Sequence, residues 1–360
     1  MVAAGYNDVI VNLSPVGMLM ELHNVPYMDL SKPWYDQNAN AQTSLDGKLF
    51  ATAGEMLIMD NEATYGVLFN KKVAEDYGFE NFYEKVNDGT WTIDYMTECS
   101  RAVAKDLDGD GVMGEKDQWG CIGEAFNTYG YMVGCGVQAY EKNKDDIPVF
   151  TVNSERFHDS FVKAFQLNRD DKSTMFSENF KAADVFTEVI DPAFSEGRVM
   201  FNVAGLVRVT VFRAMETDFG ILPMPMYDKE QKKYIQYSDA YCPNFYSIPN
   251  TTKGGKLDDT TFILEALALE SVGTLTPAYY DTCLKTRYSM DHDSSKMIDI
   301  ILSNYSIDLC DVYLDQWGGF RTLVQNCIRN GSSITNLVRM NGRPVKIKIA
   351  ETLEQIKALP

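Results

Sequence analysis

Short apolar segments alternate with helical segments along most of this chain, and that alternation is the feature that most limits its fold. From Ile93 to Val103, apolar residues recur every three or four positions, which predicts an amphipathic helix over 91–105. Strands alternating with helices are typical of an α/β protein rather than an all-β protein or a bundle. Strands are expected at 8–11, 65–70, 199–203 and 219–222. Further helices are expected at 71–77, 157–167, 182–190, 261–272, 294–304 and 342–359, with one more ending near Met215.

Size and charge narrow the possible functions. The chain has 360 residues, enough for a large core and, by default, two domains. Its 51 acidic residues outnumber 33 basic ones and give a formal net charge of −18. Such a surface repels phosphate backbones and anionic lipids, so we expect no nucleic-acid or membrane-surface partner. No apolar run reaches the roughly 18 residues that suggest a membrane-spanning helix.

The cysteines and histidines form no recognisable motif. Seven cysteines are scattered without a CxxC pair, and three histidines are dispersed. This pattern favours neither a zinc site nor a redox site. We therefore expect the cysteines to be buried as small apolar residues.

Residues 106–117, DLDGDGVMGEKD, have the layout of a calcium loop, with acidic residues at the first, third and fifth positions and glycine at the sixth. A sensor needs two helices that change their angle, but the segment after this loop reads as a strand. The sequence thus predicts one structural Ca²⁺, with a solvated acidic turn lacking metal as the alternative. The expected ligands are the carboxylates of Asp106, Asp108, Asp110 and Asp117 and the backbone carbonyl of Val112.

Several stretches along most of the chain occur in the order and spacing of one protein family. They are KPWYDQ (32–37), DGKLFATAGEM (46–56), GVLFNKKVAEDYGFEN (66–81), GTWTIDYMTECSRAVAKDLDGDG (89–111), EGRVMFNVAG (196–205), METDFGILPMP (215–225), SIPNTT (247–252) and PAYYDTCLKTRYSMDHDSSKMIDII (277–301). Together they resemble the extracellular solute-binding proteins of carbohydrate ABC importers, family 1, which are maltose-binding-protein-like. No single stretch is specific enough alone.

The resemblance implies a fold, a function and a location. It implies a two-lobed α/β fold of the type II periplasmic-binding-protein kind, in which each lobe is a sheet flanked by helices and a hinge joins the lobes. It further implies a monomer that is not an enzyme, captures a sugar or oligosaccharide between the lobes and delivers it to an ABC permease. We expect an extracellular protein, lipid-anchored at full length. Because family members carry a signal segment and a βαβ unit before the strand at 8–11, we also expect the first lobe to be incomplete. The expected parts are 1–64 (first lobe), 65–240 (second lobe), 241–310 (return to the first lobe) and 311–360 (helices packing across both).

Candidate ligand residues follow the predicted strands, because ligands of open α/β sheets bind beyond the carboxyl ends of strands. Sugars need aromatic faces together with amides or carboxylates. The resemblance places three such loops on the cleft, and they contribute Asn12 and Ser14, then Phe126, Asn127 and Tyr129, then Gly205 and Arg208. It also places Trp317 near the cleft, with packing as an equal alternative. Where the chain should cross between lobes, the candidates are Asp239 and Tyr241, with Asn61 and Tyr65 at the other crossing.

Two other functions fit the sequence. Abundant carboxylates could supply the acid and base of a glycoside hydrolase, although some suitable pair always exists among so many acidic residues. The same cleft could also serve a ligand-sensing partner of a membrane receptor.

Overall fold

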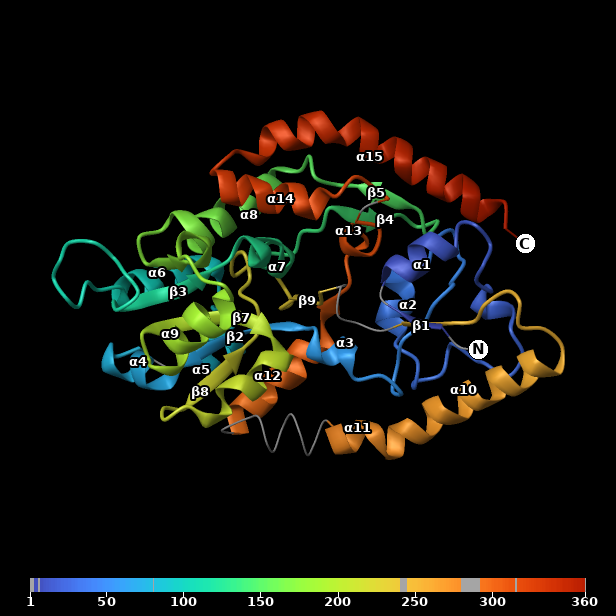
Figure 1. Cartoon of the computed structure of the whole chain (residues 1–360), viewed down its shortest axis with the longest axis horizontal. Helices are drawn as coiled ribbons and strands as arrows, with labels where there is room; N and C mark the ends of the chain where they lie inside the picture. The colour runs from blue at the N-terminus through green and yellow to red at the C-terminus, as the bar shows by residue number, and fades with distance from the viewer. Residues whose placement is uncertain are drawn as a thin grey trace.

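The computed structural model describes residues 3–5, 7–79, 81–239, 245–279, 292–314 and 316–359. Within these ranges the protein has two lobes, seen at the left and right of Figure 1, with a long C-terminal helix along one side of both. The second lobe is built on a five-stranded sheet, and the first lobe is built mainly of helices and loops around a short strand pair. The predicted two-lobed α/β architecture is therefore confirmed.

The sheet of the second lobe has the strand order β6-β3-β7-β2-β8. β3 runs parallel to β6 and β7, whereas β2 runs antiparallel to β7 and β8. The carboxyl ends of β3, β6 and β7 and the amino end of β2 consequently share one edge. The strands are β2 (Tyr65–Asn70), β3 (Trp119–Gly123), β6 (Thr174–Phe176), β7 (Val199–Gly205) and β8 (Phe219–Leu222).

Helices cover both faces of this sheet, and nearly every residue of its strands is consequently buried. α6 shows how the sequence forms them. Thr92 caps its start by accepting a hydrogen bond from the Tyr95 N–H at 3.3 Å, and the predicted apolar face, including Met96, is buried. The elements of this lobe are α4 (Lys71–Asp76), α5 (Phe82–Asn87), α6 (Ile93–Val103), η2 (Ala125–Asn127), α7 (Thr128–Gly134), α8 (Glu155–Phe165), η3 (Gln166–Asp170), η4 (Ser177–Asn179), η5 (Phe186–Ile190), α9 (Asp191–Ser195) and η6 (Leu206–Ala214).

The first lobe has its own apolar core, which includes Leu22, Tyr35, Tyr246 and Leu264. Residues 8–11, expected as a strand, belong to helix α1 instead, so that prediction is wrong. A run of four residues is too short for its spacing to separate strand from helix. The elements here are β1 (Ala3–Gly5), α1 (Asn7–Leu13), η1 (Leu22–Asn24), α2 (Gln37–Thr43), β10 (Phe245–Ser247), α10 (Gly255–Gly273) and α11 (Leu275–Pro277).

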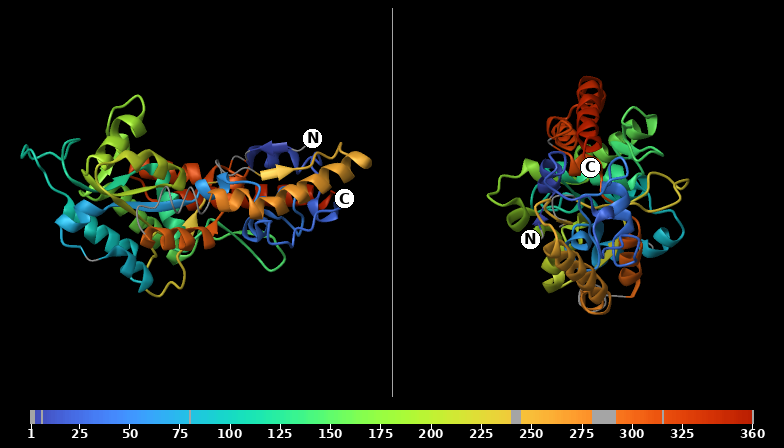
Figure 2. Two further views of the ribbon diagram at one scale, coloured as in Figure 1. Left: turned by 90° about the horizontal axis from the view of Figure 1, so that it is seen from below. Right: turned by 90° about the vertical axis from the view of Figure 1, so that its right-hand side faces the viewer.

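Several segments join the lobes. Thr64 pairs with Ser238 in an antiparallel bridge, and β9 pairs in parallel with β11. α15 packs against α14 and α8, and near its other end Lys48 Nζ donates to the Ile356 carbonyl at 3.2 Å, so the helix braces both lobes (Figures 1 and 2). The joining elements are α3 (Met59–Glu62), β4 (Tyr140–Lys142), β5 (Pro148–Phe150), β9 (Gln236–Tyr237), β11 (Tyr305–Ser306), α13 (Leu309–Val312), α14 (Phe320–Asn330) and α15 (Ile334–Lys357).

Helix α12 (His292–Ser303) lies in the range 241–310 that the predicted boundaries give to the first lobe. It packs against β8 and α5 of the second lobe instead. The cause is its apolar face, because Ile298 and Ile301 share a buried cluster with Leu68 and Ile221 of the sheet.

Two further expectations concern the chain as a whole. Across the described ranges, no helix combines the length and the apolar character needed to cross a membrane. Burial is confirmed for the five cysteines that the structure describes, whereas Cys242 and Cys283 lie outside the described residues. The five are Cys99, Cys121, Cys135, Cys310 and Cys327.

Candidate functional site

A cavity of about 610 Å³ opens where β3, β6 and β7 end and β2 begins. This is the edge at which open α/β sheets bind their ligands. The cavity is also large enough for a small-molecule ligand. Its lining comes from within the segments 62–65, 124–127, 177–190 and 202–208, and from Asp239 and Arg329.

Aromatic side chains form much of the apolar lining. The ring centroids of Tyr65 and Phe126 lie 6.4 Å apart, with 36° between the ring planes. Phe180 and Phe186 line the cavity as well, and Phe186 is 43% exposed. Aromatic faces of this kind can stack on the C–H surfaces of a sugar ring.

Polar groups at the end of β3 are held by a buried network. Asn127 Nδ2 donates to Glu124 Oε1 and to the Val203 carbonyl, both at 3.0 Å. The Glu124 N–H in turn donates to Asn168 Oδ1 at 3.0 Å. Burial, together with the nearby carboxylate of Glu178, raises the pKa of Glu124 to about 7. The cavity therefore presents an amide and a carboxyl in fixed positions.

Arg321 of α14 supports the cavity from behind. Its side chain is 3% exposed, its Nη1 donates to the Tyr237 hydroxyl at 2.7 Å and to Asp239 Oδ1 at 3.2 Å, and its Nε lies 2.9 Å from Asp311 Oδ1. The guanidinium carbon is 5.0 Å from the centroid of the Phe126 ring. Burial raises the pKa of Asp311 to about 7, and the Arg321 charge opposes that rise. Arg321 thus links two cavity residues, Phe126 and Asp239, to the protein core.

The structure brings part of the predicted ligand set together. The cavity lining includes Tyr65, one of the two candidates where the chain first crosses between the lobes. Asn61, the other candidate there, lines a separate cavity of about 310 Å³. The members of the predicted set that line the larger cavity are Phe126, Asn127, Gly205, Arg208 and Asp239.

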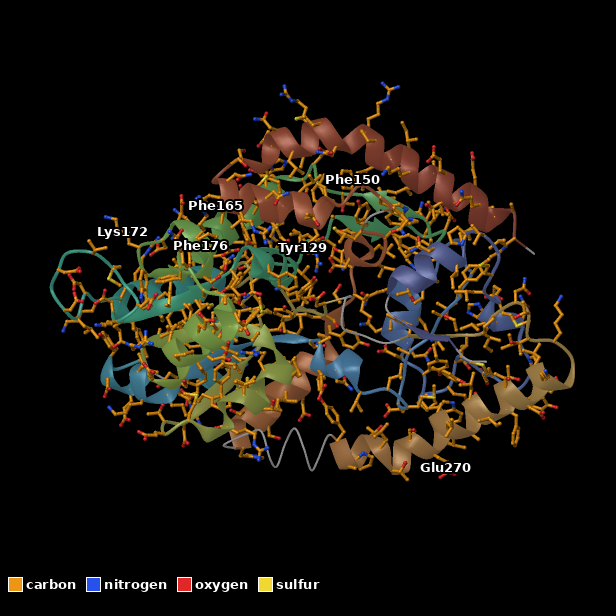
Figure 3. The ribbon with its side chains drawn as sticks, in the orientation of Figure 1. Tyr129, Phe150, Phe165, Lys172, Phe176 and Glu270 are labelled. Atoms are coloured by element: carbon orange, nitrogen blue, oxygen red, sulfur yellow. The ribbon has the colours of Figure 1, made fainter. Side chains whose placement is uncertain are left out.

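Two predicted aromatic residues lie in the core instead of the cavity. Trp317 is 1% exposed, stacks on Tyr313 with centroids 4.2 Å apart, and donates its indole N–H to Thr352 Oγ1 at 3.0 Å. Tyr129, on α7 in Figure 3, is fully buried; it donates its hydroxyl hydrogen to Asp308. The structure therefore corrects both placements, because their polar atoms are already satisfied within the protein.

The remaining candidates are also away from the cavity or cannot be placed. Asn12 is exposed and its Oδ1 accepts a hydrogen bond from Gln316 Nε2 at 2.8 Å. Ser14 is buried beside Tyr313, at a small separate cavity. Asn12 lies within α1 and Ser14 directly follows it, so neither follows a sheet strand and the rule that suggested them does not apply. Tyr241 lies outside the described residues.

The sequence interpretation missed other lining residues. Glu124 stands two residues before Phe126 and has the same strand-end signal, so the rule could have found it. Phe180, Phe186 and Arg329 come from η elements, loops and α14. These three follow no predicted strand, and no local pattern marks them.

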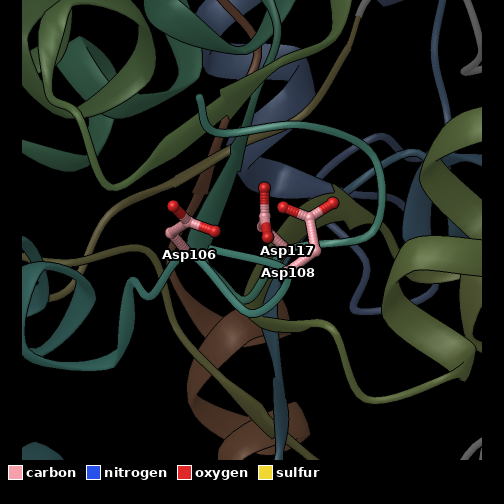
Figure 4. Close-up of side chains that lie close together, drawn as sticks. All are labelled: Asp106, Asp108 and Asp117. Atoms are coloured by element: carbon pink, nitrogen blue, oxygen red, sulfur yellow. The ribbon is translucent and has the colours of Figure 1, made fainter. Parts of the chain in front are cut away.

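The acidic loop gathers three carboxylates. Ligand oxygens of Asp106, Asp108 and Asp117 lie within 4.8 Å of one another (Figure 4). Asp117 is buried and accepts hydrogen bonds from the N–H groups of Gly114 at 2.6 Å and Leu107 at 2.8 Å, which lower its pKa. Three clustered oxygen donors, one of them held ionised, suit a hard cation such as Ca²⁺.

One of the four predicted carboxylate ligands, Asp110, is not in that cluster. The Asp110 carboxylate accepts a hydrogen bond from the Val112 N–H at 2.7 Å. Asp110 thereby stabilises the turn. The backbone carbonyl of Val112 stays a predicted ligand. The loop is entered by α6 and left by β3, as expected from the sequence.

Comparisons with known proteins give structural matches alone. No protein-family model matches the chain, and no curated protein matches it either. The ABC substrate-binding protein Lmo0181 from Listeria monocytogenes, in complex with cycloalternan, aligns with a TM-score of 0.61 at 11% identity, over 99% of this chain and 84% of that one.

Two further structures show the same likeness. The maltose/maltodextrin-binding domain MalE from Bdellovibrio bacteriovorus, bound to maltotriose, aligns with a TM-score of 0.56 at 16% identity, over 99% of this chain and 85% of that one. UgpB from Mycobacterium tuberculosis, in complex with glycerophosphocholine, aligns with a TM-score of 0.61 at 14% identity, over 98% of this chain and 84% of that one. The chain therefore has the two-lobed fold of the substrate-binding proteins of ABC transporters.

Proposed function

We propose that this protein captures a sugar or oligosaccharide in the 610 Å³ cavity and delivers it to the permease of an ABC transporter. The observation that carries the proposal is the lining itself, where aromatic faces meet the amide of Asn127 and the carboxylate of Asp239. This is the combination that saccharides require. Two structural neighbours that hold cycloalternan and maltotriose support it.

The proposal extends to the setting in which the protein works. We infer that the protein works as a monomer outside the cytoplasm and is held at the cell surface by a lipid anchor. The formal net charge of −18 supports a soluble surface that does not adhere to anionic lipid. We infer binding without catalysis.

A thermal-shift screen against mono- and oligosaccharides tests binding. A saccharide at about 100 times its Kd adds about 2.7 kcal/mol to stability by mass action. We expect the melting temperature to rise by about 3–4 °C with at least one saccharide, because the unfolding entropy of a chain of 360 residues converts 1 kcal/mol into roughly 1.3 °C. Absence of any shift across the screen would refute the proposal. Release of new reducing ends from a bound oligosaccharide would favour the hydrolase alternative instead.

We also propose that the loop at 106–117 holds one structural Ca²⁺. The carboxylates of Asp106, Asp108 and Asp117 would supply its protein ligands, and the ion would clamp the turn between α6 and β3. The support is their mutual approach within 4.8 Å and the ionised state of Asp117. The residues named as lining the cavity include none from 106–117.

Calcium is expected to change stability without switching ligand binding. Adding millimolar Ca²⁺ to chelator-treated protein should raise the melting temperature by about 1–2 °C, the effect of roughly 1 kcal/mol on a chain of this length. Asp106→Asn should abolish that rise, whereas the matched Asp110→Asn should keep it, because Asp110 is outside the cluster. A chelator that removed saccharide binding at an unchanged melting temperature would contradict this account.

A further inference from the structure

The cavity that we propose for saccharides has an excess of acidic groups. Four carboxylates line it, from Glu62, Glu124, Glu178 and Asp239, against two guanidinium groups, those of Arg208 and Arg329. An acidic lining disfavours a ligand that carries phosphate or carboxylate groups, and it favours one that is neutral or positively charged.

The guanidinium groups at the cavity are already engaged. Arg208 forms an ion pair with Asp191, whose side chain is 16% exposed. Arg329 Nε lies 3.7 Å from Glu178 Oε1. Neither arginine is therefore an uncompensated positive charge that could attract an anionic ligand. Because Asp239 is paired with Arg321 and Glu178 with Arg329, Glu62 and Glu124 set the local charge.

Glu124 is the carboxyl best placed to receive a cation. It is 9% exposed and lines the cavity, and its Oε1 accepts the hydrogen bond from Asn127 Nδ2. Across the described part of the chain, no donor is bonded to Oε2 and no Lys or Arg forms an ion pair with this side chain. A buried carboxylate with one open oxygen gains more from an ammonium group than from a neutral hydroxyl.

The aromatic lining favours the same kind of ligand. Phe126 and Tyr65 stand at the end of β3 and the start of β2, beside the segment that carries Glu124. Aromatic faces attract cations as well as the C–H surfaces of sugar rings. An amino sugar combines both properties, since its ring can stack while its ammonium group meets a carboxylate.

We propose that the ligand of this cavity is an amino sugar, free or within an oligosaccharide, whose protonated amino group is held by Oε2 of Glu124. This inference rests on the proposed saccharide-binding function and narrows its ligand class. Neutral saccharides of the same shape bind more weakly, because a hydroxyl leaves the carboxylate without a charged partner. Uronic acid oligomers are excluded by like charge.

Isothermal titration with three trisaccharides tests this assignment. The probes are the β-1,4-linked glucosamine trimer, the N-acetylglucosamine trimer with the same linkage but no charge, and trigalacturonic acid. We expect the glucosamine trimer to bind at least about tenfold more tightly than its N-acetylated counterpart, and the uronate not to bind. Glu124→Gln should remove that preference, so that the ratio of the two affinities falls to about one. The matched control is Glu75→Gln, at an exposed position of α4, and it should leave all affinities unchanged.

Each outcome separates this inference from the proposed function. A melting temperature of ligand-free Glu124→Gln within a few degrees of the wild type shows that the variant is folded. Equal or tighter binding of the N-acetylated trimer, or binding of maltotriose without binding of the glucosamine trimer, overturns the amino-sugar assignment and leaves saccharide binding intact. If no saccharide binds in either experiment, the proposed function itself fails.

Discussion

Replacing Arg321 with methionine is expected to lower the free energy of unfolding by about 3–5 kcal/mol, the range for loss of one partner from a buried ion pair. The variant leaves the carboxylates of Asp239 and Asp311 buried without their cation, and both are less than a tenth exposed. It also removes the group that lies against Phe126, so saccharide affinity should fall as well. Urea unfolding followed by tryptophan fluorescence measures the loss of stability.

The loss should depend on pH. In the variant, burial and Asp239 raise the pKa of Asp311 with no opposing charge from Arg321. When the pKa of a carboxyl is higher in the folded than in the unfolded state, the free energy of unfolding falls as the pH rises above the unfolded-state pKa. The difference in the free energy of unfolding between the wild type and the variant should therefore be larger at pH 8 than at pH 5.

Arg329→Met is the matched control for this variant. It removes an arginine from the same helix, but its side chain is 44% exposed and lies 3.7 Å from Glu178. An exposed pair contributes at most about 1 kcal/mol. Equal losses for the two variants would show that the buried cluster around Arg321 is not the stabilising unit described here.

Much of the second lobe was predictable because its elements carry clear local patterns. The apolar run at 65–70 forms strand β2 as predicted. The spacing in 91–105 predicts α6, and Thr92 caps it. The short pair β9 and β11 has no such pattern. It exists because Gln236 and Tyr305, distant in sequence, become neighbours, and no local signal shows that pairing.

The candidate site was predictable to the extent that strand ends define it. Gly205 ends β7, and Phe126 and Asn127 lie in η2, which follows β3, so the rule for open sheets applies to all three. Arg329 reaches the cavity from a distant helix, so that only the tertiary fold places it there. The sequence left two roles open for Trp317, core packing and ligand stacking, because a large aromatic side chain suits both.

Ala204→Trp is expected to abolish saccharide binding, with a loss of at least about 100-fold in affinity. Ala204 lies on β7 opposite Gly66 and lines the cavity between Val203 and Gly205. An indole at this position occupies the space in which a sugar ring would stack. The side chain is only half-buried, so the substitution should change stability far less than it changes binding.

Titration of this variant tests most directly the claim that the cavity binds saccharides. The saccharide giving the largest thermal shift is titrated calorimetrically into the wild type, Ala204→Trp and Ala102→Trp, the last of which places the same side chain on the exposed surface of α6. We expect wild-type affinity for Ala102→Trp, and loss of binding for Ala204→Trp at an unchanged fold by circular dichroism. Wild-type affinity in Ala204→Trp would contradict that claim.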